Sequence, residues 1–384
     1  MCVLFLLFDI SFFDIRLYKE RHRVCGHCER LGTYMHKHGG DIYQKDGLLD
    51  FSANINPAGI PEGIIQGAME GIRWSSHYPD TNCSDLRKAI ADKLNLPLEY
   101  IICGNGVADI IFSLVLALKP QKALLPVPSF YEYEQALKTV DCELTYFSMT
   151  KERNFELGVE FLEEIKEDTE IIFLCNPNNP TGQLIHRELL IKILKRCEQL
   201  GIWLIMDECF LDFVNASEDL TLMKYCSEAK HLVILKAFTK LYAMPGLRLG
   251  YGISSNTALL KRMREVSQPW NVSIPAQWAG IAALKEDKYV EDSLDLIKRE
   301  HKYLTIELQK LEYAIYGSRA NYIFFHTAPG LYEHCLKNGI LIRDCSNYQG
   351  LTEGYYRIAV KNHTENEQLI RVLSEVKSKW QKQL

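Results

Sequence analysis

The apolar residues of the chain fall into short continuous runs, and these runs alternate with longer segments in which apolar positions recur every three or four residues. A continuous apolar run is typical of a strand buried on both faces, and the longer period is typical of a helix. Buried strands separated by helices indicate an α/β fold with a mostly parallel sheet between two layers of helices. The pattern predicts strands at 122–127, 170–175, 202–206 and 232–235, and helices at 85–93, 109–118 and 187–200.

The pattern changes after residue 268. A charged helix is predicted at 285–311 and a closing helix at 365–379, with short strands between them at 322–325, 340–342 and 356–360. This order is typical of a smaller α+β domain. We therefore expect four parts: an N-terminal extension at 1–34 that is disordered or not a native start, an N-terminal arm at 35–65, a large domain at 66–267 and a small domain at 268–384.

Length and composition narrow the class of protein. A chain of 384 residues fits two domains, and its 47% of hydrophobic residues can fill a sizeable core. The net charge of −5 and an isoelectric point near 6.2 give no basic surface for nucleic acid, so we expect no nucleic-acid partner. The 12 cysteines are scattered and mostly lie in apolar runs, which favours reduced thiols and a cytoplasmic location over a disulfide framework.

The first residues form a separate segment. Residues 1–13 are apolar, but Asp9 interrupts them and no basic residue precedes them, so they predict neither a secretory signal nor a membrane anchor. Cys25 and Cys28 have the spacing of a thiol redox motif, but no βαβ pattern surrounds them. We expect the folded domain to start at Met35, so residues 1–34 are an upstream extension.

Polar side chains gather where three of the predicted strands end. The first strand runs into the segment 176–182, the second into Asp207 and Glu208, and the third into Lys236 and Lys240. Ligands of open α/β sheets bind at the carboxyl ends of the strands. Taken singly, each feature has an ordinary alternative, namely a turn, a helix cap or a solvated lysine. Their occurrence together favours a ligand site.

This set matches what pyridoxal phosphate requires of a protein. The cofactor needs a lysine to hold it covalently, a carboxylate to keep its ring nitrogen protonated, a donor to its ring oxygen and a cradle for its phosphate. Asp207 is the candidate carboxylate and Asn179 the candidate donor. Glycines that lead into a helix present backbone N–H groups to an anion. The candidate phosphate ligands are Gly104, Asn105, Gly106, Val107, Thr239 and Arg248. We predict no metal site.

From about Met35 to its C-terminus, the chain resembles the fold type I pyridoxal phosphate enzymes of the aminotransferase class I/II family. The resemblance rests on the Asn-Asn-Pro-Thr-Gly run at 178–182, on Asp207, and on the interval between Lys240 and Arg248. In that family the cofactor lysine lies eight residues before the phosphate arginine, which selects Lys240 as the catalytic lysine. The resemblance implies a large domain with a sheet of the seven-stranded type and a smaller α+β domain.

The resemblance also assigns residues outside these motifs. Lys236 comes too early for the cofactor lysine and remains a positive neighbour near the strand end. Phe130 matches the aromatic ring that stacks on the cofactor. Tyr78, in the Tyr-Pro pair of the family, matches a tyrosine that reaches the phosphate in the neighbouring subunit. The resemblance thus implies a homodimer with shared sites.

Two enzyme families within this group compete. Histidinol-phosphate aminotransferases share nearly all of the apparatus, but the variable segments resemble the threonine-phosphate decarboxylases of cobalamin biosynthesis. Many of the transaminases have a tyrosine at the position of Phe210, and a phenylalanine cannot donate to the ring oxygen, which leaves that contact to Asn179. The segments that resemble the decarboxylases are 36–40, 49–57, 77–80, 103–106 and 339–351.

The resemblance implies that L-threonine O-3-phosphate loses CO2 and gives (R)-1-amino-2-propanol O-phosphate. The bond of Cα that stands perpendicular to the cofactor ring is the one that breaks, so the orientation of the substrate decides the outcome. Lys240, water or a tyrosine would return a proton to Cα. Such a substrate carries two anions and needs cationic or polar groups. The candidate substrate ligands are His38, Asn54, Asn56, Arg343 and Arg357.

Two other functions, a transaminase and a regulator built on the same fold, have different requirements. A transaminase would need 2-oxoglutarate as co-substrate. A regulator that uses the cofactor as a sensor would need a DNA-binding domain ahead of the fold, and residues 1–34 have no helix-turn-helix pattern. Threonine phosphate and serine phosphate differ by one methyl group, which a pocket discriminates by only about 1–3 kcal/mol.

Overall fold

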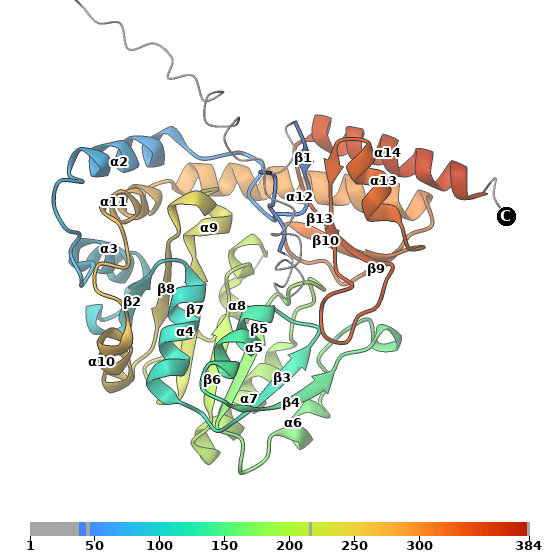
Figure 1. The fold of residues 1–384 in the computed structure, drawn as a ribbon. Coiled ribbons are helices and arrows are strands. Elements are labelled where there is room, and N and C mark those ends of the chain that lie inside the picture. Colours follow the sequence, from blue (N-terminus) through green and yellow to red (C-terminus); the bar gives the residue numbers. More distant parts are fainter. Residues whose placement is uncertain (1–37, 44–46, 215–216, 382–384) are drawn as a thin grey trace, which may run out of the picture. The chain divides into compact units, whose positions relative to one another are not determined.

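A computed structural model describes residues 38–43, 47–214 and 217–381 of the chain (Figure 1). The predictions for the extension at 1–34, including the Cys25 and Cys28 pair, lie outside the described residues. Within the described part, three sheets form, of seven, four and two strands. The division into four parts stays a prediction.

The seven-stranded sheet has the order β2-β8-β7-β6-β5-β3-β4. Neighbours from β7 to β4 run parallel, and β8 alone is antiparallel to both of its neighbours. The predicted α/β fold with a mostly parallel sheet is therefore confirmed. The strands are β2 Ile101–Gly104, β3 Lys122–Val127, β4 Glu143–Ser148, β5 Ile171–Cys175, β6 Trp203–Asp207, β7 Leu232–Ala237 and β8 Gly250–Ile253.

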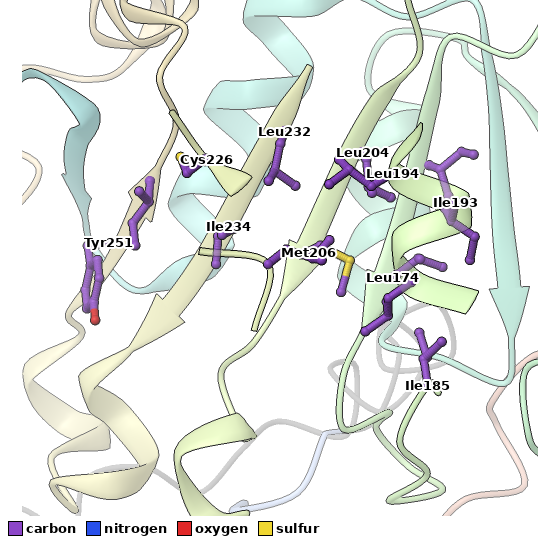
Figure 2. Close-up of a cluster of buried hydrophobic side chains, with 14 of the residues drawn as sticks. Leu174, Ile185, Ile193, Leu194, Leu204, Met206, Cys226, Leu232, Ile234 and Tyr251 are labelled. Atoms are coloured by element: carbon purple, nitrogen blue, oxygen red, sulfur yellow. The ribbon is translucent and has the colours of Figure 1, made fainter. Parts of the chain in front are cut away.

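Both faces of the central strands are buried, which explains their continuous apolar sequence. In β5, Ile171 and Phe173 pack into one core, while Ile172 and Leu174 pack into the other. Successive side chains of a strand point to opposite faces, so a strand between two helical layers must be apolar throughout. Figure 2 shows part of the second core, where Leu174 of β5 lies beside Met206 of β6 and the side chains of a neighbouring helix, and Ile234 of β7 lies beyond Met206.

Helices cover the two faces in separate groups. The first face is covered by α4 Val107–Leu118, α5 Tyr131–Lys138 and α10 Thr257–Val266. The second face is covered by α2 Glu62–Arg73, α3 Ser84–Leu94, α7 Arg187–Leu200 and α11 Ile274–Ala283. The short helices are α6 Phe161–Glu164, α8 Ser217–Leu220 and α9 Phe238–Leu241. The three helices predicted for this part of the chain correspond to α3, α4 and α7.

The C-terminal part of the chain builds a four-stranded sheet with its own core. Its order is β12-β13-β10-β9, and every pair is antiparallel. A strand from the N-terminal arm, β1 Leu49–Asp50, pairs with β11 Ile340–Leu341 beside it. The other elements are β9 Ala314–Tyr316, β10 Tyr322–His326, β12 Arg343–Asp344, β13 Tyr355–Ala359, α12 Asp287–Lys310, α13 Leu331–Lys337 and α14 His363–Gln381.

No helix in the described part of the chain is both long enough and apolar enough to span a membrane. The 24-residue helix α12 is long enough, but charged residues recur along it.

Strand β7 is longer than its apolar run predicts. It continues to Ala237, so Lys236 lies inside the strand and is only 5% exposed, not just past the strand end. Its Nζ lies 2.7 Å from Asp212 Oδ1 and 3.6 Å from Glu208 Oε2. These two carboxylates raise the pKa of Lys236 despite its burial. A buried lysine is stable when it is paired in this way, and a sequence pattern that treats lysine as polar ends the strand too early.

We predict that Lys236→Met destabilises the protein by about 3 kcal/mol, because Glu208 would remain buried without its cationic partner. Chemical denaturation measures the free energy of unfolding. The matched control is Lys230→Met at an exposed position, which should change it by less than about 0.5 kcal/mol. Equal effects of the two substitutions would contradict a structural role for the Lys236 ion pairs.

Candidate active site

The predicted site residues meet where β5, β6 and β7 end. Cys175 is in register with Asp207, and Asp207 is in register with Leu235, so the segments that follow these strands emerge at one edge of the sheet. The order of the strands is the reason that residues far apart in sequence become neighbours. This edge is where ligands bind in open α/β sheets.

Asp207 is a buried carboxylate held by two donors. The Tyr133 hydroxyl donates to its Oδ2 at 2.6 Å, and the Cys209 backbone N–H donates to its Oδ1 at 3.0 Å. Tyr133 is itself stacked on Phe173 and packs edge-on against Phe130. The sequence reasoning missed Tyr133, although it lies three residues after Phe130 and therefore on the same face at the start of α5.

Lys240 lies in α9, the short helix that follows β7. Its Nζ is 5.8 Å from the centroid of the Phe210 ring. Burial and the nearby Arg357 and Arg248 cations together lower the pKa of Lys240 to about 8. A substantial fraction of this amine is therefore neutral near physiological pH, and only the neutral form of a lysine is a nucleophile.

The proposed phosphate cradle lies at the N-terminus of α4. Gly106 precedes the helix with a φ of 81°, and a Cβ atom at this position would lie 2.5 Å from Arg248 Nη2. The Asn105 N–H donates to Asp109 Oδ2 at 2.9 Å, and the Gly106 N–H donates to the Gly104 carbonyl at 2.8 Å. These two N–H groups already have partners within the turn, so the open part of the cradle consists of the helix start and Arg248.

Three further predicted residues lie shortly after strands of the large sheet. Val107 is the first residue of α4, Thr239 is a buried residue of α9, and Phe130 directly precedes α5. Each follows a strand of the large sheet, namely β2, β7 and β3. The strand ends therefore supply the cradle, the lysine helix and the aromatic ring from one edge.

Asn179 and Arg357 are in direct contact. Arg357 Nη1 donates to Asn179 Oδ1, and Nη2 donates to the Ser52 carbonyl at 2.8 Å. The guanidinium also lies 5.5 Å from the Tyr322 ring centroid. Its Nε is buried without a hydrogen-bond partner among the described residues. Arg357 thus links the predicted ring-oxygen donor to the N-terminal arm and keeps one N–H group for another acceptor.

Arg343 lies beside Arg357 on the small sheet, because the two residues are directly opposite in the β12–β13 pair. Arg343 is also buried, and it donates to the Asp344 carbonyl and to Asn347 Oδ1, both at 2.8 Å. Its guanidinium lies 5.1 Å from the Tyr348 ring centroid, and the Tyr348 hydroxyl donates to Asn179 Oδ1 at 3.4 Å. Tyr348 lies in a segment that the sequence singled out, but the residue itself was missed.

The predicted residues of the N-terminal arm have different surroundings. His38 is half exposed, and its Nδ1 lies 3.5 Å from Glu132 Oε1. Asn54 is buried, and its Oδ1 has no hydrogen-bond partner among the described residues. Both polar atoms of the Asn56 side chain are hydrogen-bonded within the protein, to the Leu241 carbonyl and the Ala58 N–H. Asn56 therefore ties the arm to the helix of Lys240.

Tyr78 is on the surface. Its side chain is 76% exposed and stacks on Trp270, with ring centroids 4.4 Å apart. Within the described residues, no group of three or more histidine, cysteine, aspartate or glutamate side chains forms a possible metal site.

Known proteins resemble this chain along most of its length. The model of the family described as aminotransferase class I and II matches residues 46–373. Threonine-phosphate decarboxylase of Salmonella typhimurium is 36% identical over 90% of this chain and 98% of its own length. An adenosylcobalamin biosynthesis bifunctional protein of Leptospira interrogans is 28% identical over 88% of this chain and 41% of its own length.

A solved structure shows similarity in fold and sequence. Histidinol-phosphate aminotransferase from Clostridium acetobutylicum matches with a TM-score of 0.81 and 34% identity, over 86% of this chain and 100% of that chain.

The residues at the strand ends fit pyridoxal phosphate. The oxygens of Asp207 retain lone pairs for a ring N–H, Lys240 has a lowered pKa, and the space beside Gly106 and Arg248 would be filled by any Cβ. Because the family match spans most of the sequence and a relative is 36% identical over nearly its whole length, the chain belongs to the aminotransferase class I and II family of pyridoxal-phosphate-dependent enzymes.

Proposed function

We propose that this chain is a decarboxylase that converts L-threonine O-3-phosphate into (R)-1-amino-2-propanol O-phosphate and CO2. The observation that carries the proposal is the pair of buried arginines, Arg343 and Arg357, side by side at the edge of the site. Two adjacent cations suit a small molecule that carries both a carboxylate and a phosphate. The similarity to the decarboxylase of S. typhimurium supports the substrate, and the similarity to the L. interrogans protein supports a role in cobalamin biosynthesis.

Pyridoxal phosphate supplies an electron sink for the charge that remains on Cα when a bond to it breaks. Lys240 would hold the cofactor covalently, Asp207 would keep a proton on its ring nitrogen, and Asn179 would donate to its ring oxygen. Arg248, Thr239 and the start of α4, which the turn at 104–107 forms, would bind its phosphate. Phe130 would stack on its ring.

The arginines would decide which bond to Cα breaks. Arg357 contacts Asn179 and would hold the substrate carboxylate close to the cofactor, while Arg343 would hold the phosphate end. Fixing both acidic groups fixes the rotation about Cα, which is the geometric choice between losing CO2 and losing a proton. Lys240 Nζ, with its lowered pKa, would return a proton to Cα after CO2 leaves.

We also propose that the protein acts as a homodimer in the cytoplasm. Exposed apolar side chains gather on α2, α11 and the loops beside them, where Trp74 packs against Trp278 and Tyr78 stacks on Trp270. Helices α2 and α11 lie side by side in Figure 1. A patch of this kind favours a protein interface. The nine cysteines of the described residues are free thiols, which suits a reducing compartment.

A second candidate function is histidinol-phosphate aminotransferase. The 34% identity and the TM-score of 0.81 to such an enzyme from C. acetobutylicum favour it. It would require an amino acceptor such as 2-oxoglutarate, whereas a decarboxylase acts on one substrate alone.

The holoenzyme should consume L-threonine O-3-phosphate and release CO2 without any keto acid, and Lys240→Ala should lower this rate by about 10²-fold or more. Steady-state kinetics with each substrate measure the difference. Turnover that depends on 2-oxoglutarate, with histidinol phosphate as the better substrate by kcat/KM, would establish the transaminase instead.

Arg357→Ala should lower kcat/KM for the phosphorylated amino acid by about 10²-fold, because a buried, hydrogen-bonded cation in a binding site contributes about 2–5 kcal/mol. The absorbance of the bound cofactor should persist. Arg371→Ala, at an exposed position of α14, is the matched control and should keep its activity. Unchanged kinetics in Arg357→Ala would remove this residue from the site.

Sedimentation velocity should give twice the 44.2 kDa mass of one chain. Trp74→Glu should shift the protein toward the monomer, because it places a charge in the apolar patch. Val159→Glu is the matched control, since Val159 is exposed but lies outside the patch. A monomer at every concentration would contradict the dimer, and equal effects of the two variants would contradict the assigned patch.

A further inference from the structure

The proposed decarboxylation assigns no role to the carboxyl group of Glu132. Glu132 lies in α5, two residues after Phe130, and its side chain is only 15% exposed. Its Oε2 is buried and has no hydrogen-bond partner among the described residues. Its Oε1 lies 3.5 Å from His38 Nδ1. A buried polar atom without a partner is costly, so this carboxyl group requires an explanation.

The neighbours of Glu132 belong to the proposed site. Lys240 of α9 and Arg343 of β12 are close enough to favour its ionised form electrostatically, and Asp207 of β6 is close enough to oppose it. Burial raises the pKa of Tyr348, in the turn after β12, and the nearby Glu132 also raises it. Burial is the largest influence, and it raises the pKa of Glu132 to about 7. The neutral carboxylic acid is therefore well populated near neutral pH.

A purely structural ion pair between Glu132 and His38 does not account for these observations. Such a pair needs an ionised glutamate and a protonated histidine. Burial raises the pKa of Glu132, and burial together with Arg343 lowers the pKa of His38, so both shifts oppose it. The ion pair would also leave Oε2 without a partner.

The two anions of the proposed substrate give the neutral acid a function. An ionised Glu132 would repel a phosphate dianion, whereas a carboxylic acid has an O–H group that donates to it. Arg357 and Asn179 are in contact and suit the carboxylate end. Glu132, His38 and Arg343 come from three different segments and lie together, which suits the phosphate end.

We propose that Glu132 is a specificity-determining residue whose neutral carboxyl group donates a hydrogen bond to the phosphate of the substrate, next to His38 and Arg343. This inference rests on the proposed function for the identity of the ligand. It goes beyond that function because it makes phosphate binding depend on an acid as well as on cations. Affinity should fall tenfold for each pH unit above the titration of Glu132 in the free enzyme.

The test is calorimetry on the holoenzyme with 1-amino-2-propanol O-phosphate, which has no carboxylate to lose. At pH 8, in buffers of different ionisation enthalpy, the wild type should take up about one proton more on binding than Glu132→Gln does, because Glu132 must regain its proton. Glu132→Gln keeps a neutral donor in place, so it should bind within about threefold of the wild type at pH 6.5 and lose the decline of affinity at higher pH.

Two variants complete the experiment. Glu134→Gln alters a carboxylate of the same helix that pairs with Lys138, and it should behave as the wild type. Glu132→Leu removes the donor and should weaken binding about tenfold at every pH, while 1-amino-2-propanol without phosphate should show no proton uptake that depends on Glu132.

Equal proton uptake by the wild type and Glu132→Gln would overturn the proposal, as would a loss of binding by Glu132→Gln at pH 6.5 in protein that retains the cofactor absorbance. Absence of binding of the phosphate ester to the wild type would overturn it as well. The readout needs no turnover, so it remains valid for Glu132 even if CO2 release fails and the proposed decarboxylation is wrong.

Discussion

The burial of Arg357 is the constraint on which the rest of the site depends. A guanidinium that is only 6% exposed must be held by hydrogen bonds, and its partners come from two distant segments, Asn179 after β5 and the Ser52 carbonyl of the N-terminal arm. These contacts bring the small sheet, the arm and the edge of the large sheet together. The same positive charge lowers the pKa of Lys240. Arg357 therefore joins three parts of the fold and also helps to lower the pKa of the candidate catalytic lysine.

Much of the fold could be predicted from the apolar pattern, because strands buried on both faces and amphipathic helices have distinct periods. The strand at 122–127 and the helix at 187–200 match β3 and α7. The pattern was weaker where a charged residue is buried with its partner, as with Lys236 in β7. The pattern did not predict the strands β2, β4 and β8. Helix α11 is apolar nearly all round, so its sequence has no amphipathic period.

The site could be predicted to the extent that its residues follow strand ends or family motifs. Asp207, Lys240 and Arg357 are of this kind, and the structure brings their segments together. Tyr133 and Glu132 escaped notice because an ordinary helical segment contains them, and only tertiary packing shows that one holds Asp207 and the other faces His38.

Decarboxylation is tested most directly by the fate of the substrate carboxyl carbon. L-Threonine O-3-phosphate labelled with ¹³C at that carbon can be followed by NMR with the holoenzyme and no added keto acid. The label should appear in CO2 and bicarbonate in step with 1-amino-2-propanol O-phosphate. Retention of the label in an organic product, with the amino group transferred to an acceptor, would contradict decarboxylation.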